Sequence, residues 1–244
     1  MKKHAFENDL YGRVLFHYFK GETKGKPYLV RDDGYRDLFD VANYFGSFED
    51  FAPIEKKLLD FAKPFRVLDV GCGPGRFSLY FQQKGWEVTA VDNSPLIVEI
   101  AKKRGVKNVL LGSIEKADLP HNFFDTILLF GNNIGIAGTI HGLGDFLNRL
   151  FPLAAKGGRI LLTSLNISRT KEKHHLAYQE NNQRAEKYIG EINLRAEYNG
   201  KIGTWFPWLL IESKALTLVA ESCGWKTVEL MDEYLYGMVL EKED

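Results

Sequence analysis

The 244-residue chain has little cysteine, no net charge and no long apolar run, and each shortage excludes a class of protein. Its two cysteines, Cys72 and Cys223, are too few for a disulfide framework. Lys and Arg together number 32, as do Asp and Glu, which disfavours a nucleic-acid partner. No apolar stretch approaches membrane-spanning length, and residues 1–9 lack the apolar region of a signal peptide. We therefore expect a cytoplasmic protein without a membrane partner.

The composition is otherwise that of an ordinary globular protein. Hydrophobic residues make up 45% and charged residues 26% of the chain, which are usual values for a packed core. A chain of 244 residues can form one large domain, or a domain with an added cap.

The most informative stretch is residues 66–95, which read RVLDVGCGPGRFSLYFQQKGWEVTAVDNSP. A short apolar run, typical of a parallel strand buried on both faces, leads into a glycine-rich turn at residues 71–75. An amphipathic helical pattern follows over residues 76–84, and a second apolar run ends on Asp92. This order of strand, glycine turn, helix, strand and acid predicts a site for a nucleoside-containing cofactor.

Each part of this stretch has a physical purpose. Glycines let the backbone turn tightly and approach a ligand with no side chain in the way. The N-terminus of the next helix favours a carboxylate or phosphate, because its unpaired N–H groups and its dipole are positive there. Asp92, at the carboxyl end of the second strand, can accept hydrogen bonds from both hydroxyls of a ribose.

The glycine spacing discriminates between cofactors. The dinucleotide fingerprint G-x-G-x-x-G is met at Gly71 and Gly73, but its third position is Arg76. The chain instead reads Asp69-x-Gly71-x-Gly73-x-Gly75, which resembles motif I of the class I S-adenosylmethionine-dependent methyltransferases. A nicotinamide or flavin site, or a decayed loop, is the less favoured interpretation.

The resemblance continues over about residues 66–165. Residues 109–114 are similar to the third strand and to the turn that contacts adenine in this family, with Ser113 where an aspartate is often found. Residues 131–135 follow the fourth strand, where cofactor and substrate meet in the family. The cofactor-binding residues that the resemblance implies are Asp69, Gly71, Cys72, Gly73, Asp92, Asn93, Ser113, Ile114, Gly131 and Asn132.

The resemblance also assigns roles. In the family, the glycine turn lies against the methionine half of S-adenosylmethionine, and the acid on the second strand holds the ribose. This gives the ribose to Asp92 and places Asp69 near the methionine amino group. We therefore expect S-adenosylmethionine as cofactor and S-adenosylhomocysteine as product. Cys72 by itself is a small residue that fills a tight turn, since nothing near it suggests thiolate chemistry.

The expected fold is α/β: a Rossmann-like, doubly wound, seven-stranded sheet with six parallel strands and one antiparallel strand. An N-terminal helical cap and an insertion after the fifth strand are added to it. The expected segments are a helical cap (1–60), a cofactor-binding core (61–165), a lid or substrate insertion (166–205) and a C-terminal helix with an antiparallel hairpin that completes the core sheet (206–244).

The cap and the insertion are less regular than the core. Apolar spacing predicts helices at residues 10–19, at 35–42 and from Pro53, with a polar loop over 21–34. Residues 166–205 favour a lid, and a solvated helix with a hairpin is the alternative. The last helix is expected to include Leu209.

The residues that would carry chemistry are not evident. The N/D-P-P-Y/F motif of enzymes that methylate amino groups of nucleic acids is absent, because residues 132–135 read NNIG. His141 is a weak candidate for a general base, and a surface or capping role is the alternative. Arg76 either reaches a carboxylate or is an exposed residue of the first helical turn. His174 and His175 lack companion ligands, so no metal site is expected.

The expected function is therefore transfer of a methyl group from S-adenosylmethionine to a small or medium-sized acceptor. The donor is already activated, so alignment is the main task, and the lack of an obvious catalytic triad does not argue against catalysis. Methylation of RNA or protein, or cofactor binding without transfer, are the alternatives. Nicotinamide-dependent oxidoreduction is disfavoured by Arg76. The cap and the insertion, with several tyrosines, are expected to form the acceptor pocket.

Overall fold

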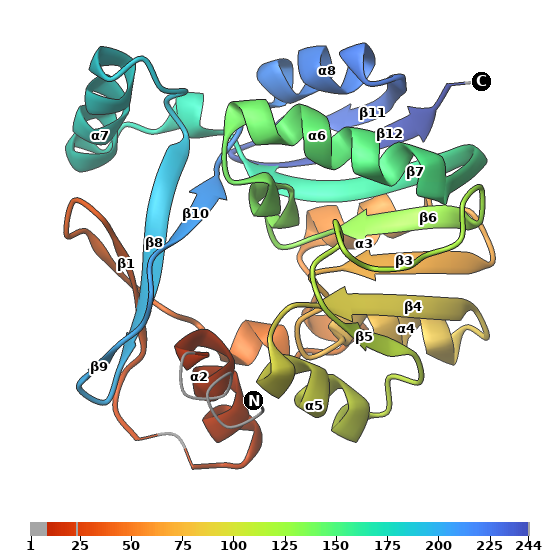
Figure 1. The fold of residues 1–244 in the computed structure, drawn as a ribbon, viewed down its shortest axis with the longest axis horizontal. Helices are drawn as coiled ribbons and strands as arrows, with labels where there is room; N and C mark the ends of the chain where they lie inside the picture. The colour runs from red at the N-terminus through yellow and green to blue at the C-terminus, as the bar shows by residue number, and fades with distance from the viewer. Residues whose placement is uncertain (1–8, 23, 244) are drawn as a thin grey trace. The chain divides into compact units, whose positions relative to one another are not determined.

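The computed structural model describes residues 9–22 and 24–243 (Figure 1). The chain divides into two compact units. The first unit comprises the chain up to Phe51, Asp69–Ala117 and Asn193–Phe206. The second comprises Ala52–Leu68, Asp118–Ile192 and the chain from Pro207. Residues 1–8 of the expected cap lie outside the described residues.

A seven-stranded sheet has the strand order β11-β12-β7-β6-β3-β4-β5. Its strands are β3 (Arg66–Val70), β4 (Glu87–Asp92), β5 (Val109–Leu111), β6 (Phe124–Leu129), β7 (Ala154–Leu165), β11 (Trp225–Met231) and β12 (Leu235–Lys242). The pair β4–β5 and the pair β6–β7 are parallel, whereas β12 is antiparallel to both β7 and β11. The predicted mixed seven-stranded sheet is therefore confirmed.

In the first unit, α4 (Arg76–Gln83) follows β3 and α5 (Pro95–Arg104) follows β4. The hydroxyl of Ser94 accepts a hydrogen bond from the amide of Ile97 at 3.1 Å, which caps α5. Pro95 occupies the first turn, where its missing N–H removes no helical hydrogen bond. Gly105 ends the helix in the left-handed conformation, with φ of 103°. Both ends of α5 are as the sequence predicts.

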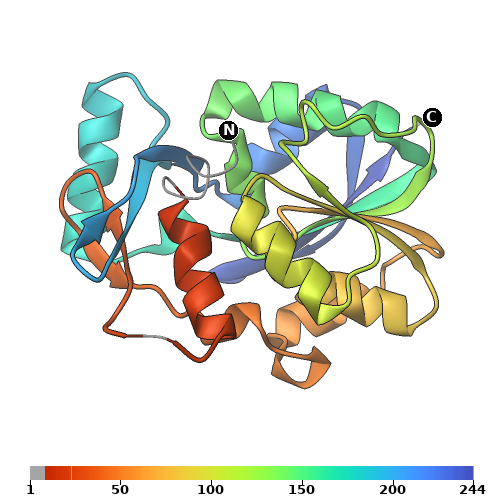
Figure 2. The same ribbon diagram turned by 60° about the horizontal axis from the view of Figure 1, so that its bottom comes forward.

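Helix α2 (Leu10–Phe19) lies beside α5 within the first unit (Figure 2). The apolar face predicted from its spacing packs with α5 in one cluster of buried residues. That cluster includes Leu10, Val14, Leu15, Ile97 and Ile100. Full burial of one such side chain contributes roughly 1.5–3 kcal/mol, so this contact fixes the helix firmly.

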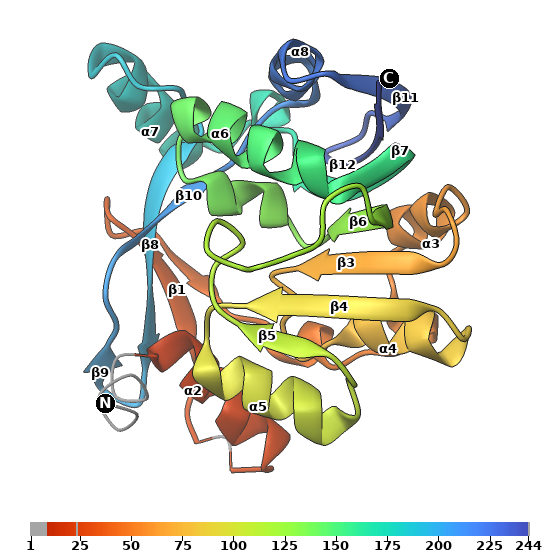
Figure 3. The ribbon, with the colours of Figure 1, turned by 45° about the vertical axis from the view of Figure 1, so that its right-hand side comes forward.

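In the second unit, α3 (Pro53–Leu59) and α8 (Ser213–Ser222) both lie against β12, where successive side chains point to opposite faces of the sheet. A Cβ at Gly237 would lie 2.8 Å from the Leu58 side chain of α3, so only glycine fits there. The adjacent Tyr236 is fully buried, and its hydroxyl donates to the carbonyl of Ile211, just before α8, at 2.9 Å. Helix α6 (Ile140–Leu150) lies side by side with α8 (Figure 3).

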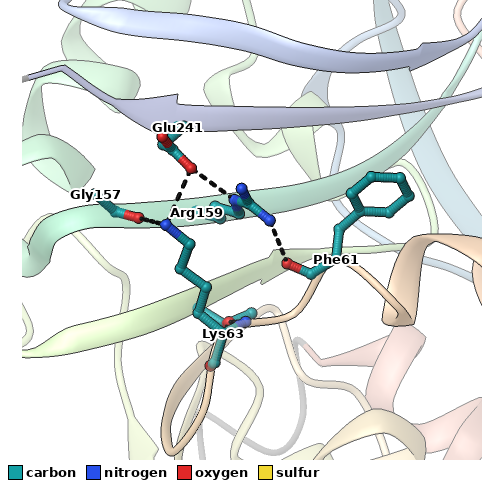
Figure 4. A network of polar contacts seen from close by, with 6 residues as sticks. Phe61, Lys63, Gly157, Arg159 and Glu241 are labelled. Atoms are coloured by element: carbon teal, nitrogen blue, oxygen red, sulfur yellow. Dashed lines mark hydrogen bonds and ion pairs between the residues drawn. The ribbon is translucent and has the colours of Figure 1, made fainter.

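A network of charged groups ties α3 to the sheet in the second unit (Figure 4). Glu241 Oε2 on β12 accepts hydrogen bonds from Lys63 Nζ at 3.0 Å and from Arg159 Nε at 2.8 Å. Lys63 Nζ also donates to the carbonyl of Gly157, and Arg159 Nη1 to that of Phe61. The hydrogen bonds from Arg159 and Lys63 hold the pKa of Glu241 below its ordinary value. Phe61 and Lys63 follow α3, and the other residues lie on β7 and β12, so the network joins the segment after α3 to the sheet.

A second sheet has the order β10-β8-β1-β2, with β9 paired to β8. Its strands are β1 (Tyr28–Arg31), β2 (Arg36–Leu38), β8 (Glu191–Tyr198), β9 (Lys201–Ile202) and β10 (Phe206–Leu209). Strand β1 is antiparallel to both β2 and β8, with Leu29 opposite Ala196. Arg36 on β2 and Glu197 on β8 form an ion pair at 3.0 Å across β1. The N-terminal segment and the insertion thus both contribute strands to this second sheet.

Several expectations outside the core are wrong. Residues 35–42 form no helix, because Arg36–Leu38 is β2 and the short 3-10 turn η1 (Ala42–Tyr44) follows it. The loop expected at 21–34 contains β1, and Leu209 belongs to β10 rather than to the last helix. Pairing with β8 supplies the backbone hydrogen bonds that make β1 a strand. The sequence of this polar segment alone does not indicate that pairing. The insertion contains α7 (Lys173–Arg184) and the β8–β9 hairpin, and its role as a lid stays a prediction.

The remaining elements are short 3-10 turns. They are η2 (Phe48–Asp50), η3 (Asn133–Ala137), η4 (Phe151–Leu153) and η5 (Ile167–Arg169). Among the described residues, every helix is too short or too polar to cross a bilayer.

Candidate functional site

The glycine turn between β3 and α4 has the conformation that the sequence predicts. Gly71, Gly73 and Gly75 have φ of 68°, 55° and 85°, values that residues other than glycine rarely adopt. A Cβ at Gly75 would collide with the Val106 side chain, so the turn also depends on close packing. The nearest atom to a Cβ built at Gly73 is a ring carbon of Tyr44 at 3.7 Å, an ordinary contact distance. The Tyr44 ring therefore lies in contact with the turn at Gly73.

Asp92 ends β4, and its carboxylate faces this turn. Oδ2 accepts a hydrogen bond from the amide of Gly73 at 3.1 Å, and Oδ1 accepts one from the amide of Ser94 at 2.9 Å. The residue is 8% exposed. Burial raises the pKa of its carboxyl to about 6, while the two backbone hydrogen bonds lower it. Each oxygen retains a lone pair for a further donor, so the carboxylate can also accept hydroxyl groups of a ligand.

Asp69 lies in β3, one residue before its end and close to the same turn. Its Oδ2 accepts a hydrogen bond from the hydroxyl of Ser78 on α4 at 2.6 Å, and both groups are buried. Burial raises the pKa of Asp69 to about 6, and the Ser78 hydrogen bond lowers it. Asp69 thus ties the strand before the turn to the helix after it.

Two tyrosine hydroxyls meet beside the turn. The hydroxyls of Tyr11 on α2 and Tyr44 on η1 are 2.7 Å apart. Burial raises the pKa of both phenols, and the nearby charge of Asp92 adds to the rise. Both side chains therefore stay protonated at neutral pH. The Tyr11 ring also contacts Phe39 and Phe206, with centroid distances of 4.6 and 6.4 Å.

The turn after β5 is tied to the end of β4. The amide of Gly112 donates to the carbonyl of Asp92 at 2.9 Å. Ser113 begins a tight turn, because its carbonyl accepts hydrogen bonds from the amides at 116 and 117. Ile114 is 2% exposed, whereas Asn93 is exposed to solvent. The structure therefore ties Gly112, just before Ser113, to the end of β4.

In the second unit, Gly131 and Asn132 follow β6 in the left-handed conformation, with φ of 67° and 66°. The Gly131 amide donates to Thr163 Oγ1 at 3.0 Å, and the Asn132 amide to the Thr163 carbonyl at 3.1 Å. The side-chain oxygen of Asn132 accepts a hydrogen bond from the Ser164 hydroxyl. The bend is therefore fixed to β7, and asparagine suits it because this residue tolerates the left-handed region.

Other candidates have more ordinary surroundings. Arg76 lies over the rings of Phe51 and Phe77, at 5.2 and 4.4 Å from their centroids. Cys72 is buried in an apolar cluster, and burial raises the pKa of its thiol well above the ordinary value. His141 is exposed near the start of α6.

The ring nitrogens of His174 and His175 lie 3.2 Å apart on α7. In the described part of the chain, no three His, Cys, Asp or Glu side chains are placed to hold a metal ion.

The comparisons with known proteins agree with this geometry. A family model described as a methyltransferase domain matches residues 67–158. A crystal structure of a SAM-dependent methyltransferase from Bacteroides fragilis, in complex with S-adenosyl-L-homocysteine, is 27% identical with a TM-score of 0.82. The alignment covers 98% of this chain and 97% of that one. These likenesses support a class I S-adenosylmethionine-dependent methyltransferase.

Curated relatives of this methyltransferase carry related names. A malonyl-[acyl-carrier protein] O-methyltransferase from Pseudescherichia vulneris is 28% identical over 179 residues, which is 68% of this chain and 69% of the relative. A mitochondrial ubiquinone biosynthesis O-methyltransferase from Schizosaccharomyces pombe is 34% identical over 113 residues, 43% of this chain and 39% of that protein. The second likeness spans about two-fifths of the relative.

The residues of this methyltransferase fit S-adenosylmethionine, its cofactor. The glycine turn has a left-handed backbone at Gly73, and Asp92 is a buried carboxylate aimed at it with hydrogen-bonding capacity left over. A buried carboxylate with a raised pKa is costly for the free protein, and a ligand that donates hydrogen bonds to it relieves that cost. This acceptor therefore suits a ligand with hydroxyl donors, such as a ribose.

Sequence reasoning missed the groups that hold these residues in place. Ser78 is the partner of Asp69, Ser94 is a partner of Asp92, and Asp9 is in turn a partner of Ser94. A signal for Ser78 was available, because it is a serine on the buried face of α4, beside Phe77 and Phe81. Asp9 gave no signal, since its partner is 85 positions away.

Proposed function

We propose that this methyltransferase acts on a small or medium-sized acceptor molecule. S-adenosylmethionine supplies an activated methyl group on a sulfonium centre. The protein must therefore bind the acceptor, orient it and exclude water, and such alignment can lower a barrier by roughly 7–11 kcal/mol in well-oriented cases.

The observation that supports this proposal is the aromatic cluster beside the glycine turn. Tyr11, Phe39 and Tyr44 contact one another, and Tyr44 lies against the turn at Gly73. Ring faces of this kind exclude water and suit a flat or apolar molecule rather than a charged polymer. The cluster lies within the first unit, next to the carboxylate of Asp92.

The tyrosine pair offers the acceptor a hydrogen-bond donor and no base. When one hydroxyl donates to the other, the second still has its own proton to donate. Because both phenols have raised pKa values, neither accepts a proton at neutral pH. An acceptor that must lose a proton therefore releases it elsewhere, or after the methyl group has moved.

The names of the relatives support a small acceptor. They include malonyl-[acyl-carrier protein] and ubiquinone-biosynthesis O-methyltransferases. An RNA-modifying relative, the 23S rRNA (uracil(747)-C(5))-methyltransferase of Pyrococcus abyssi, is matched over 33% of its length. The absence of net charge on this chain also disfavours RNA.

The finer assignments belong to the same proposal. Asp92 holds the ribose, and Asp69 orders the loop near the methionine amino group. Gly131 and Asn132, in the bend after β6, also contact the cofactor. Ser113 and Ile114 contact the adenine. The parallel pairs β4–β5 and β6–β7, with β12 antiparallel to its neighbours, support a sheet of six parallel strands and one antiparallel strand. The second sheet, built from segments outside the family match, is the part that adapts the enzyme to its acceptor.

A labelling experiment tests the proposal. The protein is incubated with S-adenosylmethionine carrying a labelled methyl group and with metabolite extract, acyl carrier protein, ribosomal RNA or total protein in separate reactions. Label is expected in the metabolite or carrier-linked fraction, and at a limiting cofactor concentration Asp92→Ala should reduce it while Asp60→Ala, at an exposed position, should not. Label confined to RNA or to total protein would overturn the small-acceptor proposal.

A further inference from the structure

A continuous chain of hydrogen bonds runs from helix α2 to the carboxylate of Asp92. It begins at Asp9, the N-cap of α2, whose Oδ1 accepts the amide of Gly12 at 2.8 Å. The other oxygen of Asp9 accepts the hydroxyl of Ser94. Asp9 therefore uses one oxygen to cap its own helix and the other to reach the start of α5.

Ser94 passes the connection on to the cofactor site. Its hydroxyl caps α5, and its amide donates to Asp92 Oδ1 at 2.9 Å. Asp92 Oδ2 in turn accepts the amide of Gly73 in the glycine turn. All of these groups belong to the first unit, and Ser94 and Asp92 are 7% and 8% exposed. The position of the Asp92 carboxylate thus depends on contacts made by α2.

The close approach of α2 requires glycine at position 12. A Cβ at Gly12 would lie within 3.0 Å of the Ser94 hydroxyl and of both carboxylate oxygens of Asp9. Glycine within a helix costs about 1 kcal/mol relative to alanine, so its use here needs a reason other than helix stability. Room for the Asp9–Ser94 hydrogen bond is that reason.

The same helix places an aromatic group over the site. Tyr11 stands between Leu10, which packs on α5, and Gly12, and its hydroxyl bonds to Tyr44 beside the turn. Docking of α2 therefore sets the Asp92 carboxylate through Ser94 and the tyrosine pair through Tyr11.

We propose that Asp9 is a positioning residue that couples the docking of α2 to cofactor binding, by fixing the Asp92 carboxylate through Ser94. The inference rests on the proposed role of Asp92 as the cofactor carboxylate. It adds that the N-terminal helix, which lies outside the residues matched by the family model, contributes to cofactor affinity.

Two substitutions break this connection in different ways. Asp9→Ser retains a good helix cap but lacks the second carboxylate oxygen, which accepts the hydroxyl of Ser94 in the unsubstituted protein. Gly12→Ala inserts a methyl group between Asp9 and Ser94, although alanine itself strengthens a helix. Each variant should weaken S-adenosylhomocysteine binding, measured by titration calorimetry, about tenfold, which is 1.4 kcal/mol.

Matched controls separate the coupling from general damage. Gly144→Ala also changes a helix glycine, but nothing lies within 4 Å of its Cβ position. Asp60→Asn removes a carboxylate that is exposed at the end of α3. Both controls should leave the dissociation constant within about twofold of the unsubstituted protein, the range expected for surface changes. Thermal unfolding of every variant without ligand checks that the fold is retained.

A double-mutant cycle supplies the readout that a purely structural role would not change. If Asp9 acts through Asp92, Asp9→Ser should have less than about a twofold effect in an Asp92→Asn background, whereas independent effects would multiply. The same comparison with Gly12→Ala covers the case in which Asp9→Ser fails to fold.

The possible outcomes separate the two proposals. Unchanged binding for Asp92→Asn would refute the assignment of the cofactor carboxylate. Weaker binding for Asp92→Asn, together with unchanged binding for Asp9→Ser and Gly12→Ala, would refute the coupling alone. Multiplicative effects in the cycle would also refute it, because α2 would then act without Asp92.

Discussion

Replacement of Asp92 by alanine is the perturbation whose consequences the structure defines most closely. The substitution removes the acceptor for the amides of Gly73 and Ser94 and leaves the rest of β4 in place. It also removes a buried charge, whose burial raises the pKa of the carboxyl to about 6. These two effects have opposite signs for the free protein, since lost hydrogen bonds destabilise it and the removal of a buried charge stabilises it.

The magnitudes differ for the free and the cofactor-bound protein. Hydrogen bonds to a charged group contribute about 1.5–3 kcal/mol each, and burial of the charge offsets a similar amount in the free protein. The stability of the free protein should therefore change by less than about 1.5 kcal/mol. In the complex, the ribose also loses its acceptor, so binding should weaken by roughly 1–3 kcal/mol, or about 5-fold to 150-fold.

Calorimetric titration with S-adenosylhomocysteine at pH 7.5, together with thermal unfolding with and without ligand, measures both quantities. Asp60→Ala serves as the control, because Asp60 is an exposed carboxylate at the end of α3. The reasoning is refuted if Asp92→Ala binds as tightly as the unsubstituted protein, or if both variants lose the same affinity.

Three further predictions concern pH, packing and the ion-pair network. If cofactor binding needs ionised Asp92, whose pKa is about 6, affinity should fall about tenfold between pH 7 and pH 5; a flat titration profile would contradict this. Gly75→Ala should lower the free energy of unfolding by about 1–3 kcal/mol in denaturant melts, because φ is 85° and Val106 blocks the added methyl group. Gly85 has a similar φ of 80°, but nothing lies close to its Cβ position, so Gly85→Ala should lower the free energy of unfolding by clearly less. An equal loss would argue against the contact with Val106. Glu241→Gln should cost about 1 kcal/mol at pH 7. The pKa of Glu241 is lowered in the folded protein, so its contribution is present above the ordinary pKa and is lost as pH falls through the folded value; a cost that persists at low pH would show a packing effect instead.

The parts of the fold that the sequence predicts are those set by neighbouring residues. The glycine turn is predictable because left-handed backbone at Gly71, Gly73 and Gly75 follows from the residue type. Helix α5 is equally local, since Ser94 and Pro95 begin it and Gly105 ends it.

The second sheet could not be predicted, because its pairing joins distant segments. Strand β1 bonds to β8, so Leu29 lies opposite Ala196. The alternation of apolar and polar residues in β8 indicates a strand, but it does not show that the partner of this strand is β1. The expected helix at residues 35–42 is wrong for the same reason: its apolar residues pack separately, with Phe39 buried in the α2 cluster and Leu38 exposed.

The candidate site divides in the same way. Asp69 and Asp92 are predictable from their spacing to the glycine turn, and the structure buries both beside it. The hydrogen bonds from Ser78 to Asp69 and from Ser94 to Asp9 are not predictable, because a hydrogen bond between side chains that are not sequence neighbours has no local pattern. The Tyr11–Tyr44 contact depends likewise on how α2 docks.

The most direct test of the central claim is a crystal structure of this protein with S-adenosylhomocysteine. The expected result is the carboxylate of Asp92 within hydrogen-bonding distance of both ribose hydroxyls, with the amino acid portion against the turn at residues 71–75. A ligand whose sugar is held by other residues, while Asp92 keeps only its bonds to Gly73 and Ser94, would contradict the account.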